Sequence, residues 1–477
     1  MMKSKKFYIT TSIPYTNAPP HIGHVFEFIQ ADVIARYRRS LGEDVYFLTG
    51  SDEHGLKTKR AAEALGKTAE EFADEMSQKF KDLKDLFNLS NDDFIRTTDE
   101  ERHLPALEKL WNKLQDNGDL YKKKFSGLYC AGCEAFKTTK EIVDGKCVIH
   151  QKEVETIEEE NYFFKLSKYL PKIKKVIESD EIRIIPESKK NEVLAMLESI
   201  EDISFSRDKD KYWGFSVPGD DSQVIYVWAD ALPNYISAIG YGTDEEKFNK
   251  YWPADIHCIG KDIVKFHAIY WPAMLLSLGL ELPKKIFVHG FINSGGQKMS
   301  KSLGNVIDPI ELIQKYGTDA VRYYLLREIT PTEDGDFTYE KFEQRYNSDL
   351  AGGIGNLLSR TLTLSLRPDF KEKKPTSKIK KASDNTAKEV RKHLNDLKFN
   401  DALVSIWELI SFCDKCINEE KPWEWNVGAS QVISDVMRAL EEISELLLPF
   451  LPETVERIKE SIKDKKSVTL FPRLTKI

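Results

Sequence analysis

The chain has 477 residues, of which 41% are hydrophobic and 31% are charged, and its net charge is −7. This length is too great for one ordinary core, so we expect two to four domains in a soluble globular protein. No run approaches the roughly 18 apolar residues that a membrane span needs, and no apolar signal core follows the basic N-terminus. These features predict a cytoplasmic protein without a membrane partner. The net negative charge argues against a protein that coats nucleic acid non-specifically. It does not exclude a local basic surface that binds RNA.

The first part of the chain alternates between short strands and helices. Residues 7–12 form the first predicted strand, and a Pro-rich turn at 13–20 leads into a helix with apolar residues at helical spacing. Strand, loop and helix in alternation predict an α/β domain with a parallel sheet. Further strands are predicted at 45–48, 224–228, 256–259 and 286–289.

Two later regions have a different texture. Residues 121–221 combine a Cys/Gly segment, an acidic run and mixed strand and helix signals, which indicates an insertion. From about residue 342 onward the sequence is almost entirely amphipathic and helical, with one more strand predicted at 468–470. The pattern therefore predicts an α/β domain, an insertion and an all-α C-terminal part.

A histidine pair lies between the first strand and the following helix, in His21-Ile22-Gly23-His24. A helix N-terminus offers unpaired N–H groups and a positive dipole end, which suit a phosphate. Gly23 would let a base or phosphate approach the backbone, and the two imidazoles can donate hydrogen bonds to charge that develops on a phosphate. By itself this pattern is more often a pair of chance helix caps.

A second basic motif, Lys298-Met299-Ser300-Lys301-Ser302, follows the turn Gly295-Gly296. Two lysines three residues apart on a flexible loop can hold a polyphosphate as mobile point charges. A lone pair of such lysines is more often a solvated basic turn, so this motif does not decide the function alone.

Together, and in this order, the two motifs resemble the HIGH and KMSKS signatures of class I aminoacyl-tRNA synthetases, without a substitution in either. The resemblance implies a Rossmann-type catalytic domain with ATP along the C-terminal edge of its sheet. It implies catalytic roles for His21, His24, Lys298 and Lys301. The implied ATP contacts, accompanied by Mg²⁺, are these four residues with Gly23, Asp262 and Ser300.

Further segments resemble the methionyl-tRNA synthetases over essentially the whole chain, namely residues 12–15, 50–55, 227–232, 260–267 and 271–274. The resemblance implies that methionine is activated with ATP and transferred to initiator and elongator tRNA(Met). A thioether pairs well with aromatic rings, and the Asp52 carboxylate would take the ammonium group. Taken singly, each aromatic residue is more often core than pocket. The implied methionine-binding residues are Ile13, Tyr15, Asp52, Trp228, Ala231, Leu232, Tyr235, Phe266, His267 and Trp271.

Other functions are less consistent with these patterns. The Leu, Ile and Val enzymes need a large editing domain, because one methylene discriminates by only ~1–3 kcal/mol, and this insertion is too small for one. A cysteinyl-tRNA synthetase is the main competitor within the class, but its metal would lie in the amino-acid site. A smaller nucleotidyltransferase would lack the helical end, and a non-catalytic tRNA-binding paralogue should show decayed histidines or lysines.

The insertion contains a metal-binding pattern, Cys130-x2-Cys133-x13-Cys147-x2-His150. This is the spacing of a Cys3His zinc site, and four ligands leave no open position for catalysis. We therefore expect one structural zinc per chain rather than four unrelated buried side chains. Cys413 and Cys416 lie in a helical run without a nearby second pair, and they suggest no metal.

The helical end carries the expected RNA contacts. Asn356 and Arg360 share one face of a predicted helix, and Trp423 follows Pro422 after another. By resemblance these three read the CAU anticodon, since an aromatic plate can stack an unpaired base while amide and guanidinium groups read its edge. The sequence given shows no β-barrel RNA-binding extension, which favours a monomer.

The resemblance and the changes of texture predict five segments. They are 1–118 and 224–285 (the two halves of the Rossmann-type domain), 119–223 (the zinc-knuckle insertion), 286–343 (the KMSKS region that contacts the tRNA stem) and 344–477 (the helical-bundle anticodon-binding domain).

Overall fold

The structure is a computed structural model that describes residues 5–137, 141–149, 151–299 and 304–475. The chain divides into two compact units, and each is described by itself. Within the described residues no helix is both long enough and apolar enough to cross a membrane. The first unit comprises Met1–Pro20, Gly42–Lys84 and Asn91–His289, and the second comprises His21–Leu41, Asp85–Ser90 and Gly290–Ile477.

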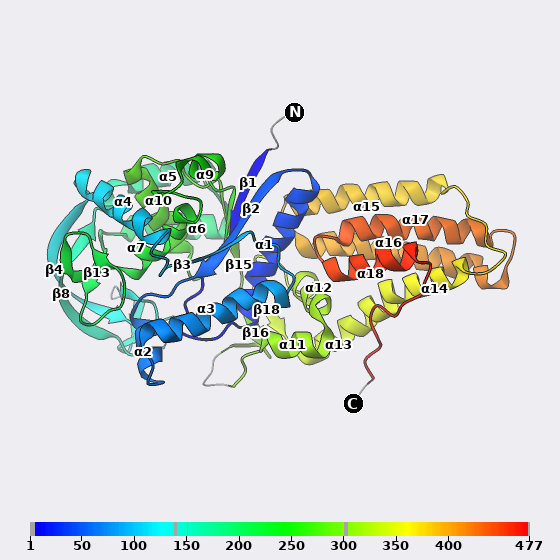
Figure 1. The fold of residues 1–477 in the computed structure, drawn as a ribbon, viewed down its shortest axis with the longest axis horizontal. Helices are drawn as coiled ribbons and strands as arrows, with labels where there is room; N and C mark the ends of the chain where they lie inside the picture. The colour runs from blue at the N-terminus through cyan, green and yellow to red at the C-terminus, as the bar shows by residue number, and fades with distance from the viewer. Residues whose placement is uncertain (1–4, 138–140, 150, 300–303, 476–477) are drawn as a thin grey trace. The chain divides into compact units, whose positions relative to one another are not determined.

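The first unit is built on a six-stranded parallel sheet (Figure 1). Its central strands are almost wholly buried. Near-continuous apolar runs form these strands, because helices cover both faces of a parallel sheet. The spatial order is β3 (Asp93–Arg96), β2 (Asp44–Ser51), β1 (Lys6–Thr10), β14 (Ile256–Gly260), β15 (Lys285–His289) and β9 (Arg183–Ile185). The chain order reverses between β1 and β14, and ligands of open α/β sheets bind at such a switch point.

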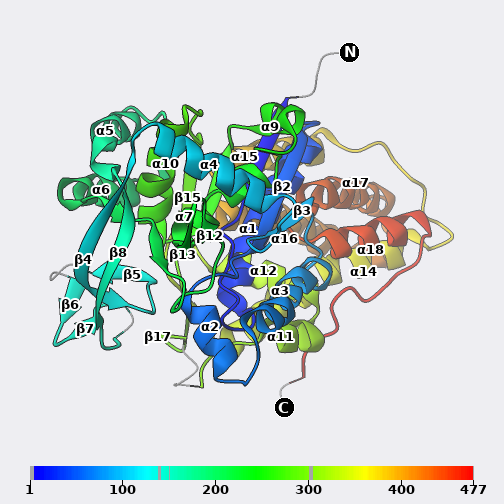
Figure 2. The ribbon, with the colours of Figure 1, turned by 60° about the vertical axis from the view of Figure 1, so that its left-hand side comes forward.

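Helices and short turns connect these strands and pack around them (Figure 2). They are α2 (Leu56–Glu63), α3 (Ala69–Leu86), α4 (His103–Asp116), η2 (Leu166–Lys168), α5 (Leu170–Glu178), α6 (Glu187–Met196), η3 (Leu197–Ser199), α7 (Val227–Ala231), α8 (Asn234–Ser237), α9 (Glu245–Tyr251), η4 (Phe266–Tyr270) and α10 (Trp271–Leu278).

The predicted strands at 7–12, 45–48, 256–259 and 286–289 are confirmed as β1, β2, β14 and β15. The strand predicted at 224–228 is partly wrong. Strand β13 (Asp220–Ile225) ends at Ile225, and Val227 already begins α7. A short buried apolar run is compatible with either structure, so periodicity could not separate the two.

The insertion is a set of small antiparallel sheets. Strands β4 (Leu120–Cys130) and β8 (Glu155–Phe164) form a long ribbon, with the short hairpin β6 (Ile142–Val143) and β7 (Lys146–Cys147) near one end (Figure 2). After this ribbon the chain returns to the six-stranded parallel sheet and adds β9 as an edge strand of that sheet. The remaining antiparallel strands are β5 (Ala135–Lys137), β10 (Ile203–Ser204), β11 (Ser206–Asp208) and β12 (Ser216–Val217), of which β11 and β12 flank β13.

The second unit joins the first long helix, α1 (Ile22–Ser40), to the helical C-terminal part. Its long helices α15 (Ser377–Asn395), α16 (Phe399–Glu420) and α17 (Ala429–Leu447) run alongside one another and bury apolar stripes at helical spacing (Figure 1). The other elements are β16 (Ile292–Ser294), β17 (Gln297–Lys298), α11 (Pro309–Tyr316), α12 (Thr318–Glu328), β18 (Gly335–Phe337), α13 (Tyr339–Arg345), η6 (Tyr346–Gly355), α14 (Asn356–Ser365), η7 (Pro422–Glu424) and α18 (Pro452–Lys463).

The strand predicted at 468–470 is wrong, because this described segment has no strand partner. Its apolar residue Leu470 is buried in the second unit, and the Arg457 guanidinium donates hydrogen bonds to the carbonyls of Thr469 (2.7 Å) and Leu470 (2.8 Å). An arginine thus satisfies the backbone where a neighbouring strand would otherwise be needed. The predicted fold class, an α/β parallel-sheet domain with a cysteine-bearing insertion followed by a helical domain, is confirmed.

A fully buried ion pair ties α1 to the helical part of the second unit. Arg322 on α12 donates to the Asp32 carboxylate on α1 (2.7 Å) and to the carbonyls of Phe87 (3.0 Å) and Phe450 (2.8 Å). Burial acts to raise the pKa of Asp32, but the guanidinium groups of Arg322 and Arg36 outweigh it and lower the pKa. Asp32 is therefore a buried anion that depends on its cationic neighbours.

We predict that Arg322→Met lowers the free energy of unfolding by about 3–5 kcal/mol, because Asp32 is left as an uncompensated buried charge. As a control, Arg345→Met breaks the partly exposed pair with Glu328 (2.8 Å) and should cost at most about 1 kcal/mol. Urea denaturation followed by circular dichroism measures both losses, and a small loss for both variants would contradict the role of the buried pair.

Candidate functional site

The residues expected to bind the small substrates follow the strands on either side of the switch point. Ile13 and Tyr15 come directly after β1, Asp52 comes after β2, and Asp262 comes after β14. Because the strands are parallel, their carboxyl ends meet at one edge of the sheet. The structure thus brings the expected residues of the first unit to one edge.

Asp52 is held by its backbone beside the segment that follows β1. Its N–H donates to the carbonyl of Pro14 (2.8 Å), and its carbonyl accepts from the N–H of Thr16 (2.9 Å). The residue is only 2% exposed, and its Oδ1 has no hydrogen-bond partner among the described residues. Burial, followed by the charge of Asp230, raises the pKa of Asp52 well above its ordinary value. A buried carboxylate with an unused acceptor is suited to a ligand cation.

The two residues after Asp52 have partners that sequence reasoning did not find. Glu53 accepts bidentate hydrogen bonds from Arg96 (2.7 and 2.9 Å), and His54 Nδ1 lies 2.8 Å from the Asp230 carboxylate. Burial acts to raise the pKa of Asp230, but His54 and then His103 outweigh it and lower the pKa. The two residues that follow Asp52 are therefore fixed, which leaves the Asp52 carboxylate available at a rigid position.

Aromatic side chains form a wall in the same unit. Trp228, on α7, stacks on Phe266 with ring centroids 3.7 Å apart, and Tyr15 meets Trp228 edge-on at 6.2 Å. The Tyr15 hydroxyl and the Trp228 indole nitrogen are buried atoms without a hydrogen-bond partner among the described residues. An apolar wall with unused polar atoms is typical of a small-molecule site.

A chain of hydrogen bonds supports this wall from behind. His267 Nδ1 lies 3.0 Å from the carbonyl of Ile263 and so carries the proton, which leaves Nε2 to accept from the Tyr235 hydroxyl (2.7 Å). Trp271 Nε1 donates to His257 Nε2 (3.3 Å), so His257 Nδ1–H faces the Thr10 hydroxyl (2.7 Å). Burial, and then the charge of His267, lowers the pKa of His257 well below its usual value, which keeps that imidazole neutral.

Three other residues that were expected to bind methionine are buried in the core of the first unit. Trp271 has no exposed area, and Ala231 and Leu232 are 3% and 2% exposed at the end of α7. Sequence reasoning missed the supporting residues His257 and Thr10, because both lie on strands and carry no local motif.

The histidine pair caps α1 in the second unit. The Gly23 N–H donates to His21 Nδ1 (3.1 Å), the His21 N–H donates to His24 Nδ1 (3.2 Å), and the two rings stack at 3.8 Å. Both Nδ1 atoms accept hydrogen bonds, so the proton of each neutral ring lies on Nε2. Burial lowers the pKa of His21 to about 4, so this ring is a neutral donor at pH 7. We expected Gly23 to let a ligand approach the backbone. In the structure a side chain at this position would instead collide with the His21 ring, because a Cβ would lie 2.9 Å from it.

The lysine motif is described only in part. Gly295 and Gly296 turn between β16 and β17 with φ of 60° and 77°, which favour glycine. Lys298 is the last residue of β17, while Ser300 and Lys301 lie outside the described residues. The expected approach of these lysines to a polyphosphate stays a prediction.

Three of the four expected metal ligands come together in the insertion. The Sγ atoms of Cys130, Cys133 and Cys147 lie within 4.8 Å of one another, and those of Cys133 and Cys147 are 3.7 Å apart. Tetrahedral zinc with Zn–S bonds of about 2.3 Å needs sulfur atoms about 3.8 Å apart, so the cluster has the dimensions of a metal site. The fourth expected ligand, His150, lies outside the described residues.

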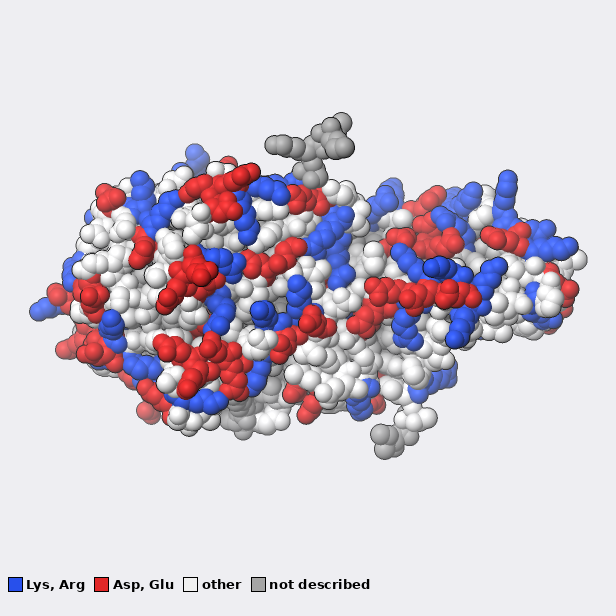
Figure 3. Space-filling view, in the orientation of Figure 1, with Lys and Arg blue, Asp and Glu red and all other residues white. Residues whose placement is uncertain are grey.

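Two of the three expected RNA-reading residues, Arg360 and Trp423, meet in the second unit, and Asn356 lies one turn before Arg360. Asn356 begins α14, and Arg360, on the same helix, holds its guanidinium 5.6 Å from the centre of the Trp423 ring. Trp423 is 44% exposed, so a base could reach it. A second pair, Arg367 over Trp425 at 4.5 Å, was missed because nothing in the local sequence distinguishes it. Charges of both signs are interspersed on the face shown in Figure 3.

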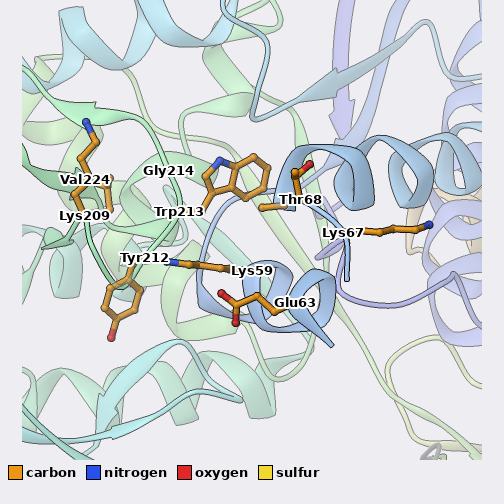
Figure 4. Close-up of a pocket in the computed structure, with 10 residues that line it drawn as sticks. Lys59, Glu63, Lys67, Thr68, Lys209, Tyr212, Trp213, Gly214 and Val224 are labelled. Carbon is orange, nitrogen blue, oxygen red and sulfur yellow. The ribbon is translucent and has the colours of Figure 1, made fainter. Parts of the chain in front are cut away.

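A surface cavity in the first unit has no comparable chemistry (Figure 4). Its Lys59 donates to the carbonyls of Asp210 (3.0 Å) and Lys211 (3.1 Å), and its Lys209 donates to Ser216 (3.0 Å). The labelled lysines point in different directions instead of toward one centre. Since these cations are paired and do not converge, the cavity is not an anion site.

Comparison with known proteins agrees with this geometry. Residues 7–143 and 137–362 match the family model of class I tRNA synthetases (M), and residues 378–476 match that of the anticodon-binding domain of tRNA ligases. The chain is 44% identical to a methionine–tRNA ligase of Thermotoga maritima, over 97% of this chain and 76% of that protein. It is also 44% identical to one of Clostridium acetobutylicum, over 97% of this chain and 74% of that protein.

A solved structure gives the same result. The methionyl-tRNA synthetase of Mycobacterium tuberculosis in complex with methionyl-adenylate superposes with a TM-score of 0.91 at 37% identity, and 99% of each chain is covered. With family models over most of its length and relatives this similar, the chain belongs to the methionyl-tRNA synthetases, a family of class I aminoacyl-tRNA synthetases.

Proposed function

We propose that this chain is a methionine–tRNA ligase that carries out the two-step reaction of its family. L-Methionine and ATP give methionyl-adenylate and pyrophosphate, and the methionyl group then passes to tRNA(Met), initiator and elongator alike. The observation that carries this function is the buried Asp52 carboxylate with an unused oxygen beside an aromatic wall at the switch point. A cation and a polarizable apolar chain are the two ends of methionine.

Asp52 binds the methionine ammonium group, and the thioether lies against the aromatic wall. Ile13 and Tyr15 are the nearest candidates for contact with the sulfur, and Trp228 and Phe266 provide the flat surface. The remaining pocket residues are buried around this wall and complete the pocket: Ala231, Leu232, Tyr235, His267 and Trp271.

Activation needs no general base, because the methionine carboxylate is already an anion. Its oxygen attacks the α-phosphorus of ATP, and the bond from that phosphorus to the bridging oxygen breaks to release pyrophosphate. The Nε2–H groups of His21 and His24 donate to the phosphate oxygens as charge develops, and Gly23 allows the imidazole cap that orients them. Lys298 and Lys301 follow the leaving pyrophosphate. Asp262 and Ser300 complete the ATP contacts, and Mg²⁺ bound with ATP offsets the phosphate charge.

Transfer depends on recognition of the tRNA by the helical part of the chain. The 2′-hydroxyl of the terminal ribose attacks the methionyl carbonyl, and AMP leaves. Trp423 stacks an anticodon base while Asn356 and Arg360 read base edges. A monomeric state, a cytoplasmic location and the five-segment division given above stay predictions.

The cysteine cluster holds one structural zinc, with His150 as the fourth ligand. This favours methionine over the cysteine alternative, because a cysteine enzyme would need its metal in the amino-acid pocket. Within the part of the chain that the structure describes, the cysteine cluster is the one group of side chains that could hold a metal.

We predict methionine-dependent ATP–pyrophosphate exchange and none with cysteine. Asp52→Asn should reduce kcat/KM for methionine by about 100-fold or more, because the ammonium loses its charged partner. The raised pKa of Asp52 predicts that methionine affinity increases as pH rises and Asp52 loses its proton, and that the Asn variant loses this dependence. The exposed Asp210 is the control, and Asp210→Asn should exchange normally. Equal rates for methionine and cysteine would contradict the function.

We predict that Trp423→Ala raises KM for tRNA(Met) about tenfold or more, the value of one lost base stack, while pyrophosphate exchange stays unchanged. Leu65 is 63% exposed in the first unit, outside the segments expected to contact tRNA, so Leu65→Ala is a control that should leave aminoacylation unchanged. Aminoacylation and exchange assays measure the two steps separately, and equal losses in both would exclude an anticodon role.

We predict that Cys133→Ser lowers the zinc content from about one per chain to near zero, because the cluster loses one of its thiolates. Cys416→Ser, on α16, should retain the metal. Elemental analysis of the purified variants decides this, and zinc retained in Cys133→Ser would place the metal elsewhere.

A further inference from the structure

Glu134 connects the cysteine knuckle to the loop that carries Asp52. It follows Cys133 directly, has a left-handed backbone (φ 52°) and is 1% exposed. Its Oε1 accepts from the Lys57 N–H (2.6 Å), and its Oε2 accepts from the Tyr129 hydroxyl (2.9 Å). A strained backbone that aims a buried carboxylate at another segment points to a specific role.

That role is visible at the start of α2. The helix begins after Gly55, which has no side chain and so cannot cap the unpaired N–H groups of the first turn. The Glu134 carboxylate takes one of these N–H groups, that of Lys57, and its charge is favourable at a helix N-terminus. Gly55 has φ 107°, and a Cβ there would meet Glu134 Oε1 at 3.1 Å. Gly55 therefore leaves room for the Glu134 carboxylate, and this side chain from the cysteine knuckle caps the N-terminus of α2.

The capped turn reaches the proposed methionine pocket through Lys57. Its Nζ lies 3.9 Å from the centre of the Tyr15 ring, which stands edge-on to Trp228. An ammonium group in the first turn of a helix opposes the helix dipole, and the adjacent Glu134 carboxylate offsets this. The cation–π contact holds one face of Tyr15 and so helps fix the aromatic wall.

We propose that Glu134 is a positioning residue through which the metal-bound knuckle sets the shape of the methionine pocket. The cysteines that would hold the metal fix the turn from Cys130 to Cys133. That turn aims Glu134 at α2, and α2 holds Lys57 against Tyr15. This inference rests on the proposed function, and it concerns the binding of methionine rather than of ATP.

The test uses the full chain with its metal and compares Glu134→Ala, Glu134→Gln and Glu155→Gln. Glu155 is the matched control, since it also reaches α2 from the insertion, but through a half-exposed ion pair with Arg60 (3.0 Å). Glu134→Ala should raise the Kd and KM for methionine about tenfold, the effect of one lost helix cap, with the KM for ATP and the metal content unchanged. Glu134→Gln should show a smaller rise, about threefold, because its amide oxygen still accepts from Lys57. Glu155→Gln should match the parent.

Titration calorimetry with methionine on metal-stripped protein adds a second readout. Removal of the metal should weaken methionine binding by the parent. It should have no further effect on Glu134→Ala, because both changes break the connection from the knuckle through Glu134 to α2. A methionine Kd within about twofold of the parent in both metal-loaded Glu134 variants would overturn the inference. So would parallel increases in KM for methionine and ATP, or loss of metal from these variants. If Glu134→Ala does not fold, the Gln variant decides. A parent without methionine-dependent exchange would instead overturn the proposed function.

Discussion

The proposed methionine site depends most on one buried carboxylate, that of Asp52. Its backbone is hydrogen-bonded to the segment after β1, and the next two residues, Glu53 and His54, are paired with other side chains. One of its oxygens has no protein partner among the described residues. Burial makes such a charge costly, as its raised pKa indicates. A ligand ammonium would offset that cost. The buried carboxylate is therefore unfavourable in the free protein but favours binding of an amino acid.

Other parts of the proposed site consist of groups that the fold holds in fixed positions. His21 is neutral at pH 7, and backbone N–H groups orient the rings of His21 and His24 before ATP arrives. The aromatic wall is likewise set in advance by the hydrogen bonds behind it, from Ile263 through His267 to Tyr235. Donors that need no reorganisation at the moment of reaction are the main source of electrostatic catalysis.

Sequence patterns could predict the central strands, since β1, β2, β14 and β15 are short apolar runs bounded by turns. They could not separate strand from helix in the equally apolar run at 224–228, where only the neighbouring sheet decides. The roles proposed for Asp52 and the aromatic residues come from the resemblance and stay predictions. Thr10 with His257 and Glu134 with Lys57 are contacts between distant segments. No local pattern records such a contact, because it is created by the fold.

The proposed pairing of Asp52 with the methionine ammonium can be tested directly. Titration calorimetry would compare L-methionine with 4-(methylsulfanyl)butanoate, which keeps the thioether and the carboxylate but lacks the amino group. The account predicts that loss of this charged contact weakens binding by about 100-fold, and that the Asp52→Asn variant no longer discriminates between the two ligands. Equal affinity of the unmodified protein for both compounds would contradict it.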